Sequence, residues 1–180
     1  IFAPLDILSE KKILEHHENH GGMSRFEKIP LYLEFASLEV TKKNVEEYLR
    51  RFSKLTKSKV IRSNWIPGVL EFLKQNHKEK TFFLISATPN EELIEIIEKL
   101  KINNFFTEVI GSPIDKSIAI AKILSAYKVD AKDALMIGDS YSDFNASLDN
   151  QIKFILRNTE FNKSLQNSLS CRKINDFYHE

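Results

Sequence analysis

Two aspartates that follow a short apolar run are the most chemically suggestive residues in the chain. Ala134–Ile137 is apolar, and Gly138, Asp139 and Asp143 follow it. Such a run predicts a buried parallel strand, and open α/β sheets bind ligands at the carboxyl ends of their strands. Because Ser140 begins a helical stretch, both carboxylates can face that edge, where a hard cation such as Mg²⁺ would relieve their repulsion. Alternatively, both aspartates simply stabilise a helix N-terminus.

A hydroxyl stands at the end of a second apolar run. Phe82–Ile85 predicts a strand that ends at Ser86. Thr88, with Glu91 three residues on, predicts a helix N-cap, which explains Thr88 and leaves Ser86 without a structural role. The Ser86 hydroxyl and the Ala87 N–H can therefore bind an anion beside a helix N-terminus, although a simple turn serine would look the same.

A lysine follows the third predicted strand, Glu108–Ile110. Lys116 falls in the first turn of a predicted helix, where the helix dipole disfavours a cation by up to about 1 kcal/mol. A lysine in this position indicates a compensating anion nearby. The plainer alternative is a solvated lysine that pairs with Asp115.

The hydroxyl, the lysine and the paired aspartates occur at three successive predicted strand ends, in that order. The ordered string FLISATPNEEL…FFTEVIGSP…K…LMIGDSYSD resembles motifs II, III and IV of the haloacid dehalogenase-like hydrolase superfamily. The resemblance covers at least residues 60–157 and is greatest to the phosphatase and phosphomutase branch with a small helical cap. It implies a doubly wound, Rossmann-like parallel sheet with an all-helical cap domain.

The resemblance also implies roles for the residues that match these motifs. Ser86, with the Ala87 N–H, would bind the transferring phosphoryl oxygens, and Lys116 would neutralise the phosphate and the attacking carboxylate. Asp139 would bind Mg²⁺, and Asp143 would hold the metal directly or through water. Phosphoryl transfer needs mainly positioning and charge neutralisation, so these residue types suit the chemistry.

The chain departs from the family at motif I. The family has an Asp-x-Asp, comprising the nucleophile and the general acid/base, on a strand between those that end at Ser86 and at Asp139. No Asp-x-Asp occurs before residue 63. We therefore expect the segment that carries motif I to be absent from this sequence. The strands ending at Ser86 and Asp139 should then be separated by a gap about one strand wide, roughly 9–10 Å.

The helical pattern divides the chain into two regions. Residues 1–60 predict the cap, with helices over Leu5–His20, Ser24–Leu38 and Lys43–Leu55. Residues 61–180 alternate strands and helices, including a last strand at Lys153–Leu156, and predict the α/β core.

The segment GGMSRFEK, residues 21–28, stands out in the predicted cap. Ser24 and Glu27 can form a capping box, which leaves Arg25 and Lys28 as unexplained cations in the first turn. The segment looks similar to a cap motif in one group of the family, which implies that Arg25 and Lys28 contact substrate. The alternative is that both face solvent.

Three histidines precede that segment, at positions 16, 17 and 20. Adjacent histidines on one helix point about 100° apart, so they favour a solvated helix end over a metal site.

Composition excludes several other classes. Among the 180 residues, Lys+Arg 26 balances Asp+Glu 25, so we expect no nucleic-acid partner. A single cysteine, Cys171, excludes an internal disulfide and a multi-cysteine zinc site, and fits a reducing cytoplasm. Without a long apolar run or a signal peptide, we expect no membrane partner.

The predicted function is a Mg²⁺-dependent phosphatase of a small phosphorylated metabolite, acting through an aspartyl-phosphate whose nucleophile is not in this chain. We expect a monomer or homodimer, inactive without that N-terminal segment. The alternatives are a sugar phosphomutase with the same site and a non-catalytic phosphate-binding protein that has lost motif I. A phosphoacceptor receiver domain also clusters aspartates, a hydroxyl and a lysine, but it lacks a helical cap and its carboxylates precede its hydroxyl.

Overall fold

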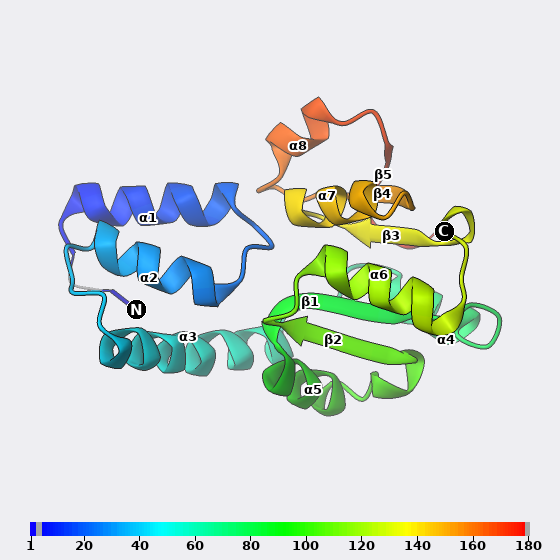
Figure 1. The fold of residues 1–180 in the computed structure, drawn as a ribbon, viewed down its shortest axis with the longest axis horizontal. Coiled ribbons are helices and arrows are strands. Elements are labelled where there is room, and N and C mark those ends of the chain that lie inside the picture. Colours follow the sequence, from blue (N-terminus) through cyan, green and yellow to red (C-terminus); the bar gives the residue numbers. More distant parts are fainter. Residues whose placement is uncertain (3–4, 179–180) are drawn as a thin grey trace.

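The computed structural model describes residues 1–2 and 5–178, which form a helical region joined to an α/β region. The N-terminus lies in the helical region (Figure 1), and the last described residues pack on the α/β region, where the Phe177 N–H donates to the Pro67 oxygen at 2.9 Å. The helical region contains α1 (Ile7–Asn19), α2 (Arg25–Phe35) and α3 (Lys42–Arg62). The predicted fold class, an α/β domain with a helical cap, is confirmed.

Polar N-caps begin the three cap helices. The side chains of Asp6, Ser24 and Thr41 accept hydrogen bonds from backbone N–H groups of the first turn. Apolar residues of α1 and α2 form a small core, whereas α3 has no buried residue. The buried apolar residues of this core are Ile13, Ile29, Tyr32 and Leu33.

The α/β region alternates strands and helices in chain order. The strands are β1 (Phe83–Pro89), β2 (Glu108–Ser112), β3 (Leu135–Gly138), β4 (Lys153–Arg157) and β5 (Arg172–Ile174). The helices are α4 (Val69–Asn76), α5 (Asn90–Lys99), α6 (Lys116–Tyr127), α7 (Tyr141–Asp149) and α8 (Lys163–Ser168), with short 3₁₀ turns η1 (Asn103–Phe105) and η2 (Ala131–Asp133). The strand pairs that the structure describes are parallel.

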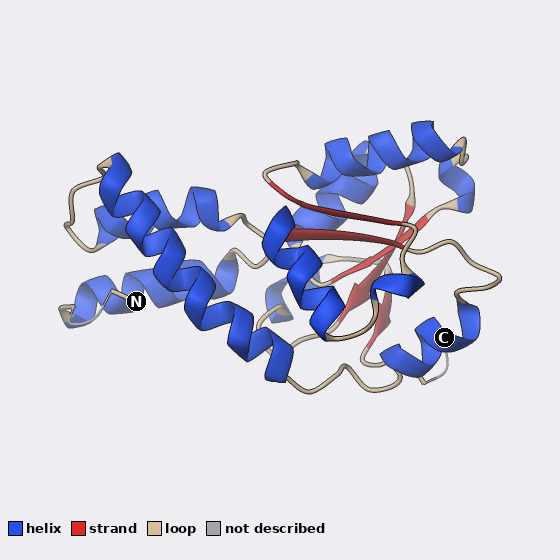
Figure 2. Cartoon of the chain, turned by 90° about the horizontal axis from the view of Figure 1, so that it is seen from below, coloured by secondary structure: helices blue, strands red, loops and turns tan. Residues whose placement is uncertain are grey.

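Helices cover both sides of the strands. In Figure 1, α5 and α6 lie on opposite sides of β1 and β2, and Figure 2 shows the strands enclosed between helices. Leu93, Ile97 and Ile102 form one buried cluster, and Ile110, Ala119 and Ile123 form a second. The strand arrows of β2 and β3 point toward the helical region, so the carboxyl edge of the sheet faces the cap (Figure 1).

The sheet is divided into two parts. Among the described residues, β1 pairs only with β2, and β3, β4 and β5 form a separate sheet in the order β3-β4-β5. No ladder joins β1 to β3, as the sequence predicted. The strands that flank this break are poorly covered: Leu135 on β3 is 50% exposed, whereas Ile155 and Leu156 on β4 are 6% and 0% exposed. A buried parallel sheet normally covers both faces of each strand, so the break leaves β1 and β3 incomplete.

The total surface agrees with this incompleteness. The accessible surface is 11640 Å². A compact monomer of the same mass, 20.9 kDa, would expose about 9,000 Å². Among the described residues, no helix is both long enough and apolar enough to cross a membrane.

Candidate active site

The turn between β3 and α7 positions the two aspartates. Ser140 is the N-cap of α7 and accepts a hydrogen bond from the Asp143 N–H, while Asp143 Oδ2 accepts one from the Ser140 N–H at 3.1 Å. This capping box folds Asp143 back beneath the end of β3. A Cβ on Gly138 would lie 2.4 Å from the Asp143 Cβ, so this close approach requires glycine.

Lys116 reaches this turn from the first turn of α6. Its Nζ donates to Asp143 Oδ1 at 2.6 Å, and the two side chains are only 12% and 8% exposed. The anion that compensates this lysine is therefore Asp143. The alternative pairing with Asp115 is wrong, because Asp115 is the N-cap of α6 and accepts from the Ser117 N–H at 2.7 Å.

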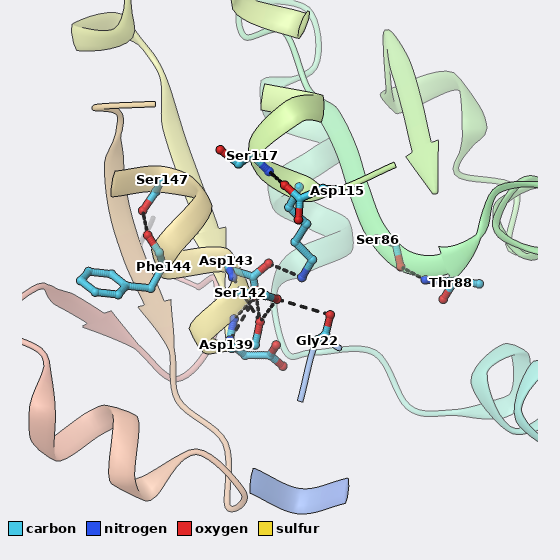
Figure 3. Close-up of polar contacts among 12 residues, drawn as sticks. Gly22, Ser86, Thr88, Asp115, Ser117, Asp139, Ser142, Asp143, Phe144 and Ser147 are labelled. Carbon is cyan, nitrogen blue, oxygen red and sulfur yellow. Dashed lines mark hydrogen bonds and ion pairs between the residues drawn. The ribbon is translucent and has the colours of Figure 1, made fainter. Parts of the chain in front are cut away.

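The two aspartates therefore differ in how many hydrogen bonds their carboxylates accept from the protein. Asp143 accepts hydrogen bonds from Lys116, from the N–H groups of Asp139 and Ser140, and from the Ser140 hydroxyl. Within the described part of the chain, no donor from another residue bonds the Asp139 carboxylate. Figure 3 shows both side chains at this turn, with the bonds converging on Asp143.

The electrostatics of Asp139 favour a nearby cation. Asp139 keeps an exposed surface, yet the protein atoms around its carboxylate displace water, and this burial is the first cause of a raised pKa. The negative charge of Asp143 raises the pKa further, and Lys116 and Arg157 oppose the shift. A cation bound at Asp139 would relieve both unfavourable effects.

These residues fit Mg²⁺ better than a metal held entirely by protein. Mg²⁺ commonly takes one or two carboxylates and completes its octahedron with waters and substrate phosphate. The open Asp139 carboxylate can supply one such ligand. The described residues contain no cluster of three or more His, Cys, Asp or Glu side chains placed to hold a metal, so a closed protein cage is not seen there.

Ser86 lies on an irregular part of β1. The register of β1 against β2 shifts between Ile85 and Pro89, and such bulges redirect side chains near sites. Ser86 Oγ accepts a hydrogen bond from the Thr88 N–H at 3.1 Å, which leaves its O–H free to donate to an anion. In Figure 3, Ser86 lies apart from the turn that carries Asp139 and Asp143. The structure thus brings Lys116 and both aspartates together, with Ser86 on the neighbouring sheet.

The predicted N-cap at Thr88 is wrong. The helix α5 begins at Asn90, Pro89 occupies the N-cap position, and no side chain caps the helix. Thr88 and Pro89 instead belong to the bulged end of β1, and the capping pattern in the sequence did not reveal this bulge. The main-chain turn at Ala87 therefore lies in strand rather than directly at a helix N-terminus.

Two further supports for the site were not predicted from the sequence. The buried Asn162 donates to the backbone oxygens of Asp139 and Arg157, at 2.8 and 2.9 Å, and so ties the end of β3 to that of β4. The Ser142 hydroxyl donates to the Gly22 oxygen at 3.4 Å, which joins the active-site turn to the cap. Gly22 has φ +83°, and a Cβ there would lie 2.4 Å from the Ser142 Oγ, so this position requires glycine. The two adjacent glycines were therefore the signal in the sequence from which this close approach could have been predicted.

The two cap cations have different surroundings. Arg25 forms a bidentate pair with Glu92 of α5, at 2.7 and 2.9 Å, and also donates to Ser53 at 2.8 Å. The pair joins the cap to the α/β region, since Glu92 lies on a helix that covers β1 and β2. Lys28 is also buried. Substrate contact by Arg25 and Lys28 remains a prediction.

The parallel strands, the helical cap and the lysine–aspartate turn define a capped α/β enzyme. A family model described as haloacid dehalogenase-like hydrolase matches residues 11–157. The chain therefore belongs to the haloacid dehalogenase-like hydrolase family, and the predicted hydrolase class is confirmed. No curated protein sequence matches the chain.

Several solved structures share the fold. CbbY from Rhodobacter sphaeroides, a mutant in complex with xylulose-1,5-bisphosphate, is 12% identical with a TM-score of 0.72, covering 97% of this chain and 80% of its own. A structure described as a predicted phosphatase from Clostridium acetobutylicum is 18% identical with a TM-score of 0.71, covering 94% and 83%. One described as a predicted phosphoglycolate phosphatase from Haemophilus somnus is 16% identical with a TM-score of 0.70, covering 93% and 79%.

Proposed function

We propose that this protein is a Mg²⁺-dependent phosphatase of a small phosphorylated metabolite. The observation that carries the proposal is the division of roles at the end of β3, where Lys116 holds Asp143 and leaves the Asp139 carboxylate open. The names of similar structures support the substrate class, since they include phosphatases and a complex with a sugar bisphosphate.

The chain's own residues bind and neutralise the phosphoryl group. Ser86 uses its free O–H to donate to a phosphoryl oxygen, and Lys116 has two further N–H donors after its bond to Asp143. Asp139 would hold Mg²⁺, with Asp143 orienting Lys116 and the turn. When bound, Mg²⁺ would neutralise the negative charge of the phosphoryl group and of the carboxylates beside it.

The nucleophile belongs, in this proposal, to a strand that fits between β1 and β3. The unpaired edges of β1 and β3 and the exposed side of β3 support such a strand. Its Asp-x-Asp would end at the same carboxyl edge as Ser86 and Asp139. The first aspartate would attack phosphorus as the ester P–O bond breaks, and the second aspartate would protonate the departing alcohol. Water attack on the resulting aspartyl-phosphate would release phosphate and regenerate the first aspartate.

The test uses the gene product that includes the Asp-x-Asp strand, assayed on p-nitrophenyl phosphate with Mg²⁺ and with EDTA. Asp139→Asn should lower kcat/KM by at least about 100-fold, because charge neutralisation supplies much of the rate in such reactions. Asp133→Asn, at an exposed carboxylate of η2, is the matched control and should retain wild-type kinetics. Unchanged activity and Mg²⁺ dependence in Asp139→Asn would refute the metal assignment.

A further inference from the structure

The histidines at the end of α1 are not used by the proposed chemistry. From the sequence we expected a solvated helix end, because the adjacent His16 and His17 diverge. His16 and His20, however, are four residues apart and so lie on one face of the helix. Their ring centroids are 3.9 Å apart and the rings are nearly parallel, at 8°. Two histidines at this spacing on one helix bind Zn²⁺ in helical metal sites.

A hydrogen bond shows which ring nitrogen of His20 is free. Its Nδ1 lies 2.9 Å from the main-chain oxygen of His16. A carbonyl oxygen only accepts, so Nδ1 carries the proton and donates, and Nε2 of the neutral ring keeps a bare lone pair. Among the residues that the structure describes, this Nε2 has no hydrogen-bond partner. Metal-bound histidines usually have this arrangement, with one ring nitrogen donating to a carbonyl and the other binding the ion.

The ring of His16 is held by the side chains of α2. Its Nδ1 lies 3.2 Å from the Tyr32 hydroxyl, which lies 3.5 Å from His17 Nδ1. The hydroxyl can accept from His16 and donate to His17, and this proton order leaves His16 Nε2 bare. Tyr32 is 2% exposed, and the Phe35 ring packs edge-on against His16. The orientation of the His16 ring is therefore restricted before any ion binds.

The two rings suit one class of ion. Burial is the first cause that lowers the pKa of His16, followed by the positive charges of His20 and Lys28, so this ring is neutral at pH 7, as a metal ligand must be. Neutral imidazole suits Zn²⁺, Ni²⁺ and Cu²⁺, whereas Mg²⁺ prefers oxygen. No third His, Cys, Asp or Glu joins them among the described residues, so water would complete the coordination.

The histidine pair adjoins the cap loop that touches the active-site turn. His20 is the C-cap of α1, and its N–H donates to the His16 oxygen at 3.0 Å. Gly22 follows two residues later, and its oxygen accepts from the Ser142 hydroxyl of α7. In Figure 1 the end of α1 lies on the side of the cap that faces the α/β region. An ion that joins the two rings would fix the last turn of α1 and, through it, this loop.

We propose that His16 and His20 form a site for a transition-metal ion of the Zn²⁺, Ni²⁺ or Cu²⁺ class, which fixes the loop between α1 and α2. Each ring would bind the ion through Nε2 after a small rotation from the parallel arrangement. Tyr32 would orient His16 without binding the ion. Such a site is distinct from the Asp139 carboxylate and does not depend on phosphatase activity.

The binding test uses the gene product that includes the Asp-x-Asp strand, in an Asp139→Asn background that removes the proposed Mg²⁺ ligand. Calorimetric titration with Zn²⁺ should show one site in this reference protein. His16→Asn and His20→Asn should each weaken Zn²⁺ binding by at least about 10-fold, since loss of even an outer-shell partner costs 10–100-fold. His17→Asn is the matched control and should bind as the reference does. No Zn²⁺ binding, or equal binding after His20→Asn, would refute the site.

Cu²⁺ provides a signature that a purely structural role of the histidines would not give. Electron paramagnetic resonance of one equivalent of Cu²⁺ should show two nitrogen ligands in the reference protein and fewer in His16→Asn and His20→Asn. Tyr32→Phe keeps the packed ring and should keep both nitrogens, while weakening Cu²⁺ binding by about 10-fold. A spectrum without two nitrogen ligands, or one unchanged by His20→Asn, would overturn the proposal.

Hydrogen exchange tests whether the ion fixes the loop. Zn²⁺ should slow exchange in a peptide covering residues 20–24 of the reference protein and have no effect there in His20→Asn, because only a bound ion suppresses local opening. The peptide covering α5 is the internal control and should not change. An equal effect of Zn²⁺ on the loop in both proteins, or none in the reference, would mean that the ion does not act on it.

Discussion

At the scale of single residues, the site depends on an unequal pair of aspartates. Asp143 is enclosed by Lys116, two backbone amides and a hydroxyl, whereas Asp139 is left without such donors. The sequence predicted that both carboxylates and the lysine belong to one site, because their residue types and their positions after apolar runs can be recognised without a structure. It could not predict which aspartate takes the lysine, since that choice depends on how α6 packs beside α7.

The raised pKa of Asp139 predicts a pH-dependent cost to stability. The native state holds this proton more readily than the unfolded state does, so stability falls as pH rises from the ordinary carboxyl range through the raised native pKa. In EDTA at neutral pH, Asp139→Asn should therefore have a higher Tm than wild type. The difference should disappear at pH values below the ordinary carboxyl pKa.

Melting curves across the acid and neutral range check this prediction, with Asp133→Asn as the exposed control. Added Mg²⁺ should raise the Tm of wild type and leave Asp139→Asn unchanged, because only a ligand that binds the native state stabilises it. A variant no more stable than wild type at neutral pH would show that Asp139 is not strained by its surroundings.

At the scale of elements, apolar runs in the sequence predicted four of the strands. Short or polar elements were missed or given the wrong bounds. The helix α3 continues to Arg62, well beyond the predicted end at Leu55, because it has no buried residue to mark its period. The strand β5 has three residues, two of them exposed, too few for an alternating pattern. Thr88 gave a false cap because β1 bulges past Ile85, which depends on pairing with β2.

The link between α2 and α5 is another feature that local sequence could not show. Arg25 and Glu92 are 67 residues apart and become a buried bidentate pair only when the cap packs on α5. Arg25 also lies over the Phe52 ring, at 4.8 Å from its centroid. Part of the conspicuous GGMSRFEK segment is therefore explained by the joint between cap and core.

Breaking this pair should destabilise the protein strongly. Glu92→Gln leaves Arg25 buried without a counter-charge, and loss of one partner of a buried pair costs about 3–5 kcal/mol of unfolding free energy. The double variant Arg25→Met/Glu92→Leu should recover most of that loss, because neither charge is then stranded. Urea unfolding of the single and double variants measures both quantities.

Lys57→Met is the matched control, because the Lys57–Glu95 pair joins the same two regions at the surface. It should leave the free energy of unfolding nearly unchanged, since solvent screens exposed pairs. A Glu92→Gln variant as stable as the Lys57→Met control would mean that the buried pair does not hold the cap on α5.

At the scale of the whole molecule, the divided sheet leaves two strands without a partner on one side. The inner edges of β1 and β3 have no strand partner among the described residues, and each unpaired buried backbone group costs about 1–3 kcal/mol. By contrast, β4 is paired on both sides and buries Ile155 and Leu156. One molecule thus contains incomplete strands and a complete strand for comparison.

Hydrogen exchange should reveal this difference directly. In the 180-residue chain, peptides covering Phe83–Pro89 and Leu135–Gly138 should exchange faster than the peptide covering Lys153–Arg157, because protection follows pairing and burial. In the gene product that includes the Asp-x-Asp strand, β1 and β3 should slow toward the rate of β4, which itself should change little. Equal protection of the three strands in the 180-residue chain, or no slowing of β1 and β3 in the longer protein, would contradict a strand between them. The internal comparison with β4 excludes a general gain in stability, which would slow all three strands together.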